Sequence, residues 1–195
     1  MKYKHWQLAA AWPAGQGGLE EAGLPPLLAG LLSGLGVVQA EDARRLLSPQ
    51  GEPVPDPMLL RDMDRAAARV GLALERKEPI AVYGDYDVDG ITSTCLLTQF
   101  LTSRGGQVLP YIPSRLGEGY GLNPEAVHAL SEQGVDLIIT VDCGITAVEE
   151  TALANSLGID VVITDHHACK DELPAAAAVV DPHRPDCPYP FKGLA

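Results

Sequence analysis

Acidic and histidine side chains directly follow three short apolar segments of this chain, and their chemistry suits a metal site. The three groups are Asp85, Asp87 and Asp89, then Asp142, and finally Asp165, His166 and His167. Carboxylates that converge at neutral pH repel one another unless divalent cations bind between them. Carboxylate oxygens mixed with imidazole nitrogens suit Mn²⁺ or a similar cation. We therefore predict a metal site for two ions, Mn²⁺ or Mg²⁺.

The apolar segments that precede these residues have the length of buried strands, and helical patterns separate them. We predict strands at 80–83, 107–112, 137–141, 161–164 and 177–180, and helices at 91–103, 124–133 and 147–157. This alternation predicts an α/β fold with a doubly wound parallel sheet that helices cover on both faces. The carboxyl ends of parallel strands meet at one edge, so the three groups are expected to lie together.

Residues 1–78 contain no convincing strand and are expected to form a helical N-terminal appendage. Apolar residues recur with helical spacing at 27–35, 41–47 and 57–77, and a proline-rich linker covers 48–57. Asp56 before Pro57 is a suitable cap for the third helix. We therefore divide the chain into this appendage and an α/β domain at 79–195.

Each chemical motif has a simpler explanation when it is considered alone. The Asp-x-Asp-x-Asp-Gly run that starts at Asp85 resembles a calcium EF-hand loop, but Leu96 occupies the position that requires glutamate. A single aspartate after a strand, such as Asp142, is commonly a helix cap or a turn residue. Only the joint placement at one sheet edge favours a metal site. The other histidines, His5, His128 and His183, are assigned no role.

The composition of the 195 residues is that of a globular protein, with a formal net charge of −12. This charge repels polyanions unless basic groups cluster or a cation intervenes. The four cysteines form no Cys-x-x-Cys pair, so we expect reduced thiols in a cytoplasmic protein. A signal peptide and a membrane-spanning segment are not expected.

The motifs resemble those of a known family. Residues 84–90, 141–144 and 164–167 resemble, in order and spacing, the first three motifs of the DHH phosphoesterase superfamily, named for Asp-His-His. Within it the chain is similar to the bacterial RecJ-type single-stranded-DNA exonucleases. That similarity includes Arg115 followed by Glu118-Gly119-Tyr120-Gly121, Leu173-Pro174 and the terminal residues 191–195. It implies that a fourth-motif aspartate and the C-terminal subdomains lie beyond Ala195.

The resemblance implies a hydrolase that degrades single-stranded DNA from the 5′ end in DNA repair and recombination. A helicase or a single-strand-binding protein is expected as a partner. Two alternatives stay open. One is a small-substrate phosphoesterase, namely an oligoribonuclease, a cyclic-dinucleotide phosphodiesterase or a pyrophosphatase. The other is a catalytically silent replication scaffold with the same fold.

The resemblance also implies roles for individual residues. Asp87 and Asp89 are expected to bind different ions, Asp142 to bridge them, and His166 to be a further ligand. Asp85 is expected to be a ligand or an outer partner of one, and Asp165 to orient an imidazole. His167 is expected to face the scissile phosphate, and Arg115 to contact a DNA phosphate because its guanidinium matches phosphate oxygens.

Overall fold

The computed structural model describes residues 18–48, 54–115, 117 and 119–194. Contacts divide the chain into two compact units, one that ends at Val54 and one that begins at Pro55. Among the described residues, no helix is both long enough and apolar enough to cross a membrane.

The first unit is a small helical cluster. It contains α1 (Gly18–Glu21), α2 (Pro26–Gly34) and α3 (Ala40–Leu46). Their shared core consists of Leu19, Ala29, Leu32 and Ala43. The sequence predicted the second and third of these helices within one residue at each end, but it did not predict the single turn α1.

The second unit is built on a five-stranded parallel sheet in the order β2-β1-β3-β4-β5. The strands are β1 (Pro79–Tyr83), β2 (Gln107–Tyr111), β3 (Leu137–Val141), β4 (Asp160–Thr164) and β5 (Ala178–Val180). The crossover helices are α5 (Val88–Ser103), α6 (Pro124–Glu132) and α7 (Val148–Ser156). Because the chain moves outward from β1 in one direction and then returns to add β3 on the other side, the sheet is doubly wound, as predicted.

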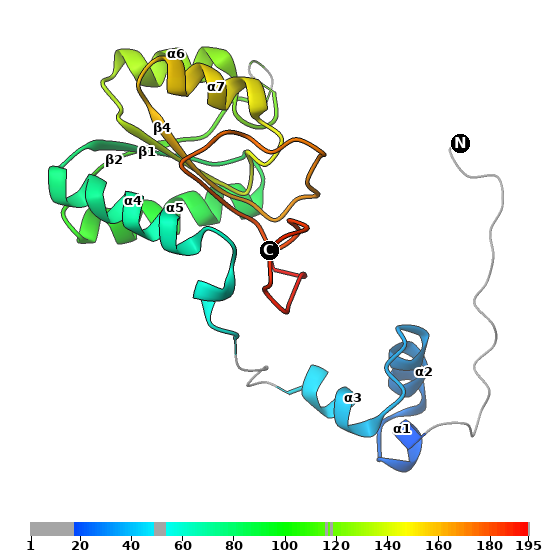
Figure 1. Cartoon of the computed structure of the whole chain (residues 1–195). Helices are drawn as coiled ribbons and strands as arrows, with labels where there is room; N and C mark the ends of the chain where they lie inside the picture. The colour runs from blue at the N-terminus through cyan, green and yellow to red at the C-terminus, as the bar shows by residue number, and fades with distance from the viewer. Residues whose placement is uncertain (1–17, 49–53, 116, 118, 195) are drawn as a thin grey trace, which may run out of the picture. The chain divides into compact units, whose positions relative to one another are not determined.

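Helices cover both faces of this sheet. In Figure 1, α6 and α7 lie over one face, and α4 (Met63–Arg76) and α5 lie over the other. The first layer buries Ala126, Leu130 and Ala154 against Ile138 and Ile163, among other residues. The second buries Ala66, Ala73 and Leu101 against Ile80, Ile139 and Val162. The crevice at the carboxyl ends of the strands lies at the reversal point between β1 and β3.

The region from Pro57 to Lys77 differs from the sequence prediction in two ways. It is a short 3₁₀ helix η1 (Pro57–Leu59), capped by Asp56 as expected, followed by a break and then α4. The break contains Asp62 in the left-handed conformation, with φ of 62°. In addition, α4 packs on the sheet through its apolar face, so it belongs with the second unit. The boundary between the compact units therefore lies at Val54–Pro55, and not after residue 78.

Candidate metal centre

The turn from β1 into α5 holds the first acidic group. Strand β1 is buried, and Asp85 directly after Gly84 is 1% exposed. One carboxylate oxygen of Asp87, Oδ1, accepts hydrogen bonds from the backbone N–H groups of Asp89 (2.9 Å) and Gly90 (3.0 Å). Asp87 is thus the N-cap of α5, which fixes its side chain in place and leaves its second oxygen outside the cap.

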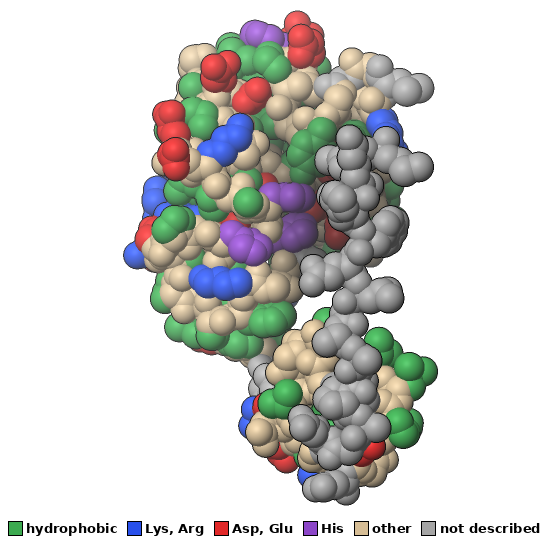
Figure 2. Space-filling view, turned by 90° about the vertical axis from the view of Figure 1, so that its right-hand side faces the viewer, with side chains coloured by type: hydrophobic (Ala, Val, Ile, Leu, Met, Phe, Trp, Pro, Cys, Tyr) green, Lys and Arg blue, Asp and Glu red, His purple; other side chains and the backbone are tan. Residues whose placement is uncertain are grey.

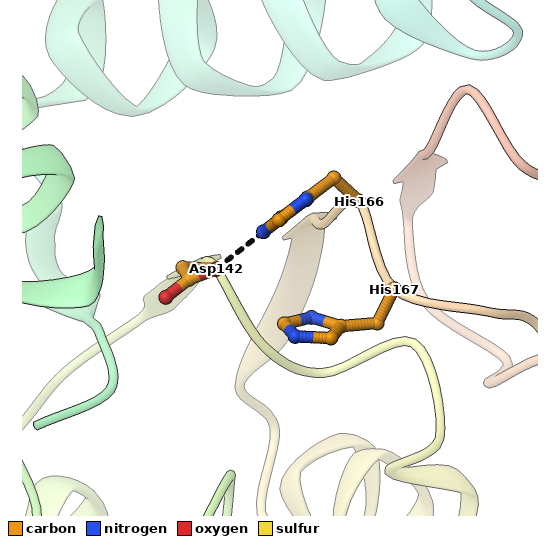
Figure 3. A group of neighbouring side chains, drawn as sticks. All are labelled: Asp142, His166 and His167. Atoms are coloured by element: carbon orange, nitrogen blue, oxygen red, sulfur yellow. Dashed lines mark hydrogen bonds and ion pairs between the residues drawn. The ribbon is translucent and has the colours of Figure 1, made fainter. Parts of the chain in front are cut away.

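Asp142 ends β3 in an unusual backbone conformation. Its φ of 60° is left-handed, a region that aspartate tolerates better than most residues. The residue is nearly buried, and its Oδ1 lies 2.8 Å from Nε2 of His166. Figure 3 shows the His166 ring directed at Asp142 from the end of β4. The sharp turn therefore presents a charged side chain in the middle of the sheet edge.

The Asp-His-His segment after β4 is ordered by its own aspartate. Oδ1 of Asp165 accepts hydrogen bonds from the backbone N–H of His166 (2.7 Å), the backbone N–H of His167 (3.1 Å) and Nδ1 of His167 (2.7 Å). Its Oδ2 accepts the backbone N–H of Ile145 at 2.9 Å. Both oxygens of Asp165 are therefore engaged by the protein itself, and the His167 ring has a fixed orientation.

Two sets of three side chains bring ligand atoms within 4.8 Å of one another. One set is Asp85, Asp87 and Asp142, and the other is Asp142, His166 and His167. Asp142 belongs to both. Figure 2 shows histidine side chains grouped on one face, with carboxylates beside them. Asp89 is in neither set, but it lines a groove of about 490 Å³ together with Asp142 and His166.

The electrostatics of these groups fit a cation. Burial raises the pKa of Asp142, and the negative charge of Asp87 adds to this, while the hydrogen bond from His166 opposes it. The N–H of Gly90 is the largest cause that lowers the pKa of Asp87. Burial lowers the pKa of His167, but the hydrogen bond and charge of Asp165 outweigh it, so that this pKa is raised.

Within the two sets of potential ligands, two buried carboxylate oxygens lack a hydrogen bond to any described residue. They are Oδ1 of Asp85 and Oδ2 of Asp142. A buried carboxylate oxygen without a donor is unfavourable, and a coordinated cation is a common solution. The donor set therefore fits a divalent metal.

Arg115 lies outside both sets, on the loop that joins β2 to α6. Its guanidinium carbon lies 5.2 Å from the centre of the Tyr86 ring. Tyr86 also meets the edge of Tyr120, with ring centres 6.4 Å apart, and Tyr120 in turn meets His167 at 6.0 Å. Sequence reasoning assigned no role to Tyr86 or Tyr120. The only signal was their position inside two of the quoted segments, 84–90 and 118–121.

Residues 79–190 match the sequence model of the DHH family, N-terminal domain. The chain belongs to the DHH family. This DHH chain is 46% identical over 176 residues to the single-stranded-DNA-specific exonuclease RecJ of Bacillus subtilis (strain 168), which covers 90% of the chain and 22% of the relative. The RecJ of Escherichia coli (strain K12) is 40% identical over 179 residues, covering 89% and 30%. The DHH chain thus spans less than a third of the length of these curated relatives.

Two solved structures are similar to the DHH chain in fold and sequence. One is a crystal structure of exonuclease RecJ bound to manganese, with a TM-score of 0.61 and 41% identity, covering 65% of this chain and 33% of that one. The other is RecJ from Thermus thermophilus in complex with Mn²⁺, with a TM-score of 0.63 and 32% identity, covering 87% and 23%. The predicted family and α/β fold are confirmed.

Proposed function

We propose that this DHH chain carries the metal centre of a 5′-to-3′ single-stranded-DNA exonuclease that hydrolyses phosphodiester bonds in DNA repair and recombination. The observation that carries the proposal is Asp142, which is shared by the two sets of potential ligands. The RecJ relatives, described as specific for single-stranded DNA, support the substrate.

The ligands for two cations would come from both sets. Asp85 and Asp87 would hold one cation, His166 would hold the other, and Asp142 would serve both because it belongs to both sets. Asp89 lines the groove that Asp142 and His166 also line, and it would be a further ligand. The solved RecJ structures with manganese support Mn²⁺, and Mg²⁺ suits the same oxygens. When bound, such cations act as Lewis acids on a phosphodiester and on water.

The remaining site residues position the substrate. His167, half-exposed and held by Asp165, is oriented to contact the scissile phosphate. Asp165 orients this imidazole by accepting a hydrogen bond from Nδ1, so that Nε2, which lies 3.4 Å from the Tyr120 hydroxyl, is the nitrogen that would face the substrate. Arg115 is exposed and lies over the ring of Tyr86, which contacts His167 through Tyr120. Its guanidinium is suited to a second phosphate of the strand.

The proposal extends to the setting in which the chain acts. Single-stranded DNA arises where a helicase separates strands, and single-strand-binding proteins cover it. We therefore propose one of these proteins as a partner and the bacterial cytoplasm as the location, in line with the bacterial relatives.

The experiment that tests this function is an end-specific nuclease assay. Because the chain spans 22% of the Bacillus subtilis relative, it is grafted into that relative in place of the matching segment. With Mn²⁺, we expect release of nucleotides from the 5′ end of a labelled single strand. A chemical block at the 5′ end should stop the reaction, and duplex DNA should resist it.

Three outcomes contradict parts of the proposal. Equal degradation from a blocked 5′ end contradicts the direction. Hydrolysis of dinucleotides, cyclic dinucleotides or pyrophosphate, with intact longer strands, identifies a small-substrate phosphoesterase instead. If the graft folds and binds Mn²⁺ but hydrolyses neither DNA strands nor the small substrates, the chain is a silent scaffold.

A further inference from the structure

The loop from β2 to α6 carries Arg115 and Tyr120, and the sheet holds both of its ends. At the β2 end, the backbone N–H of Gly84 donates to the carbonyl of Tyr111 at 3.0 Å. At the α6 end, the buried Tyr83 hydroxyl donates to the backbone carbonyl of Gly121 at 2.8 Å. Nδ2 of Asn123 donates to the Tyr83 oxygen at 3.2 Å, and Oδ1 of Asn123 caps α6. The end of the loop next to α6 is therefore fixed by buried hydrogen bonds.

In the middle of the loop, the Tyr120 hydroxyl lies 3.5 Å from the backbone oxygen of Asp142, a longer contact than those at the α6 end. Arg115 and Tyr120 are both exposed. Gly119 and Gly121 adopt left-handed backbone angles, with φ of 84° and 79°, which glycine enters readily. An exposed arginine on such a loop would normally sample many rotamers, and ordering it has an entropic cost.

Tyr86 contacts two residues in the middle of this loop, Arg115 and Tyr120. Its half-buried ring belongs to the residue between two aspartates of the metal centre, Asp85 and Asp87. The guanidinium of Arg115 lies over one face of this ring at 5.2 Å. The Tyr120 ring meets it edge-on, with an angle of 81° between the ring planes. Both geometries are attractive for the quadrupole of an aromatic ring.

The contacts continue from Tyr120 to the centre. The Tyr120 hydroxyl lies 3.4 Å from Nε2 and 3.5 Å from Nδ1 of His167, and 3.5 Å from the backbone oxygen of Asp142. A movement of Tyr86 would therefore disturb Arg115 directly and His167 through Tyr120. Tyr86 directly precedes Asp87, whose side chain caps α5.

We propose that Tyr86 is a positioning residue whose aromatic ring holds Arg115 and Tyr120 beside the metal centre. Its hydroxyl is not needed for this, since both contacts are made by the ring. Phenylalanine at position 86 should therefore preserve both ring contacts. An aliphatic residue of similar size should lose them. The consequence for substrate binding rests on the proposed function, whereas the placement of Arg115 does not.

The first test measures the placement of Arg115 in this chain by NMR. A guanidinium over a ring is shielded, so its Nε–H and Hδ resonances shift upfield. We expect this shift in the native chain and in Tyr86→Phe, and its loss in Tyr86→Leu. An unshifted Arg115 in the native chain, or a shift that survives in Tyr86→Leu, would overturn the proposal.

Phe100 provides a matched control on the same helix that Asp87 caps. Arg104 lies over the Phe100 ring at the same distance, 5.2 Å, and the ring is half-exposed. Phe100→Leu should abolish the upfield shift of Arg104 and leave that of Arg115 unchanged. The two variants remove equivalent contacts, one beside the metal centre and one near the far end of α5.

The second test separates binding from turnover with a 5′-phosphorylated oligothymidylate and Mn²⁺. The variants are made in the graft described under the proposed function. There we expect Tyr86→Leu to raise KM about fivefold with kcat within about twofold, and Tyr86→Phe and Phe100→Leu to match the graft with the native sequence. If Tyr86 acts through Arg115, the double variant Tyr86→Leu/Arg115→Gln should have the KM of Arg115→Gln alone. The role of Tyr86 in binding would be overturned if the KM increases of the two single variants multiply in the double variant. A normal KM in Tyr86→Leu would overturn it as well. If the graft with the native sequence hydrolyses no DNA, the proposed function is contradicted, and the NMR result alone then tests the role of Tyr86.

Discussion

Asp142 combines burial, a left-handed backbone and a carboxylate oxygen that lacks a hydrogen-bond donor in the described part of the chain. Each of these properties is unfavourable for an aspartate in a folded protein. Together they are consistent with the proposed binding of a cation at this point of the sheet edge. A bridging cation would remove the electrostatic penalty, and the backbone strain would remain.

We expect Asp142→Asn to lose most of the affinity for Mn²⁺. Asparagine also accepts the left-handed conformation, so the backbone should stay in place while the charge disappears. Removing a shared ligand should weaken binding by about 100-fold or more. Calorimetric titration with Mn²⁺ measures this directly. His128→Ala, on the exposed side of α6, is the control and should bind like the native chain. Equal affinities in the two variants would contradict the assignment of Asp142.

At the scale of elements, the start of α5 depends on a glycine. A Cβ atom at Gly90 would collide with the backbone of Asp85, because the first turn of the helix packs directly against the end of β1. Gly90 therefore allows the first turn of α5 to pack against the backbone of Asp85. A side chain there would force the turn that carries Asp85 and Asp87 to move.

We predict that Gly90→Ala destabilises the chain by roughly 2 kcal/mol or more, as overpacking against backbone does, and weakens Mn²⁺ binding. Gly71→Ala is the matched control. Gly71 lies inside α4, and a Cβ there meets nothing within 4 Å. The control should stabilise the chain by about 1 kcal/mol, because alanine has the higher helix propensity. Chemical denaturation, with and without Mn²⁺, distinguishes the two. Similar stabilities would mean that the turn before α5 adapts freely.

Hydrogen bonds also connect the start of α4 to strand β5 and the residues that follow it. Arg184 is 9% exposed, donates to Asp62 at 2.7 Å, and pairs with both oxygens of Asp186 at 2.9 and 3.0 Å. Asp62 also accepts the backbone N–H of Val179. Burial raises the pKa of Asp62, but the hydrogen bonds from Arg184 and Val179 outweigh it, and the pKa is lowered. Arg184 likewise holds the pKa of Asp186 down.

Arg184→Met should lower the free energy of unfolding at pH 7 by roughly 2 kcal/mol, since it leaves Asp62 partly buried without its cation. Both carboxyls have lower pKa values in the folded state than in the unfolded state. Their stabilising effect is therefore complete above about pH 5 and is lost as the pH falls below about 4. The difference between native chain and variant should shrink over that range in urea denaturation curves. A difference that stays constant down to about pH 3 would contradict this account.

These contacts explain why the sequence predicted some elements well and others poorly. The strands and crossover helices of the second unit follow from local apolar patterns and caps such as Asn123, so their bounds were predicted within about three residues. The break before α4 depends on Arg184, which lies 122 residues away from Asp62 in sequence. No local pattern contains that information.

In the candidate site, too, some features follow from local sequence patterns and others depend on contacts between distant residues. The carboxylates and imidazoles could be predicted because parallel strands deliver them to one edge. The contacts of Tyr86 could not, since they depend on the path of a loop with two left-handed glycines. For the same reason the position of Arg115 over a ring was not expected.

At the scale of the whole molecule, the two compact units raise the question of which residues the metal centre needs. Helix α4 contributes Ala66 and Ala73 to the layer that also buries Ile80, Leu137 and Ile139 of the sheet. Without α4, that part of the sheet face would be exposed to water. Arg69 of α4 also pairs with Glu78 at 2.7 Å and Asp160 at 2.6 Å, which ties the helix to the starts of β1 and β4.

We expect a shortened chain of residues 55–195 to unfold cooperatively and to be stabilised by Mn²⁺ over chelator, as the native chain should be. A chain of residues 79–195 should lack a cooperative transition. Burying a Leu, Ile or Val side chain stabilises by about 1.5–3 kcal/mol, so losing the cover over several of them exceeds the net stability of a small domain. Thermal melts followed by circular dichroism, with Mn²⁺ and with chelator, compare the two. A cooperative, Mn²⁺-dependent transition in residues 79–195 would show that α4 is dispensable and that the domain begins at β1.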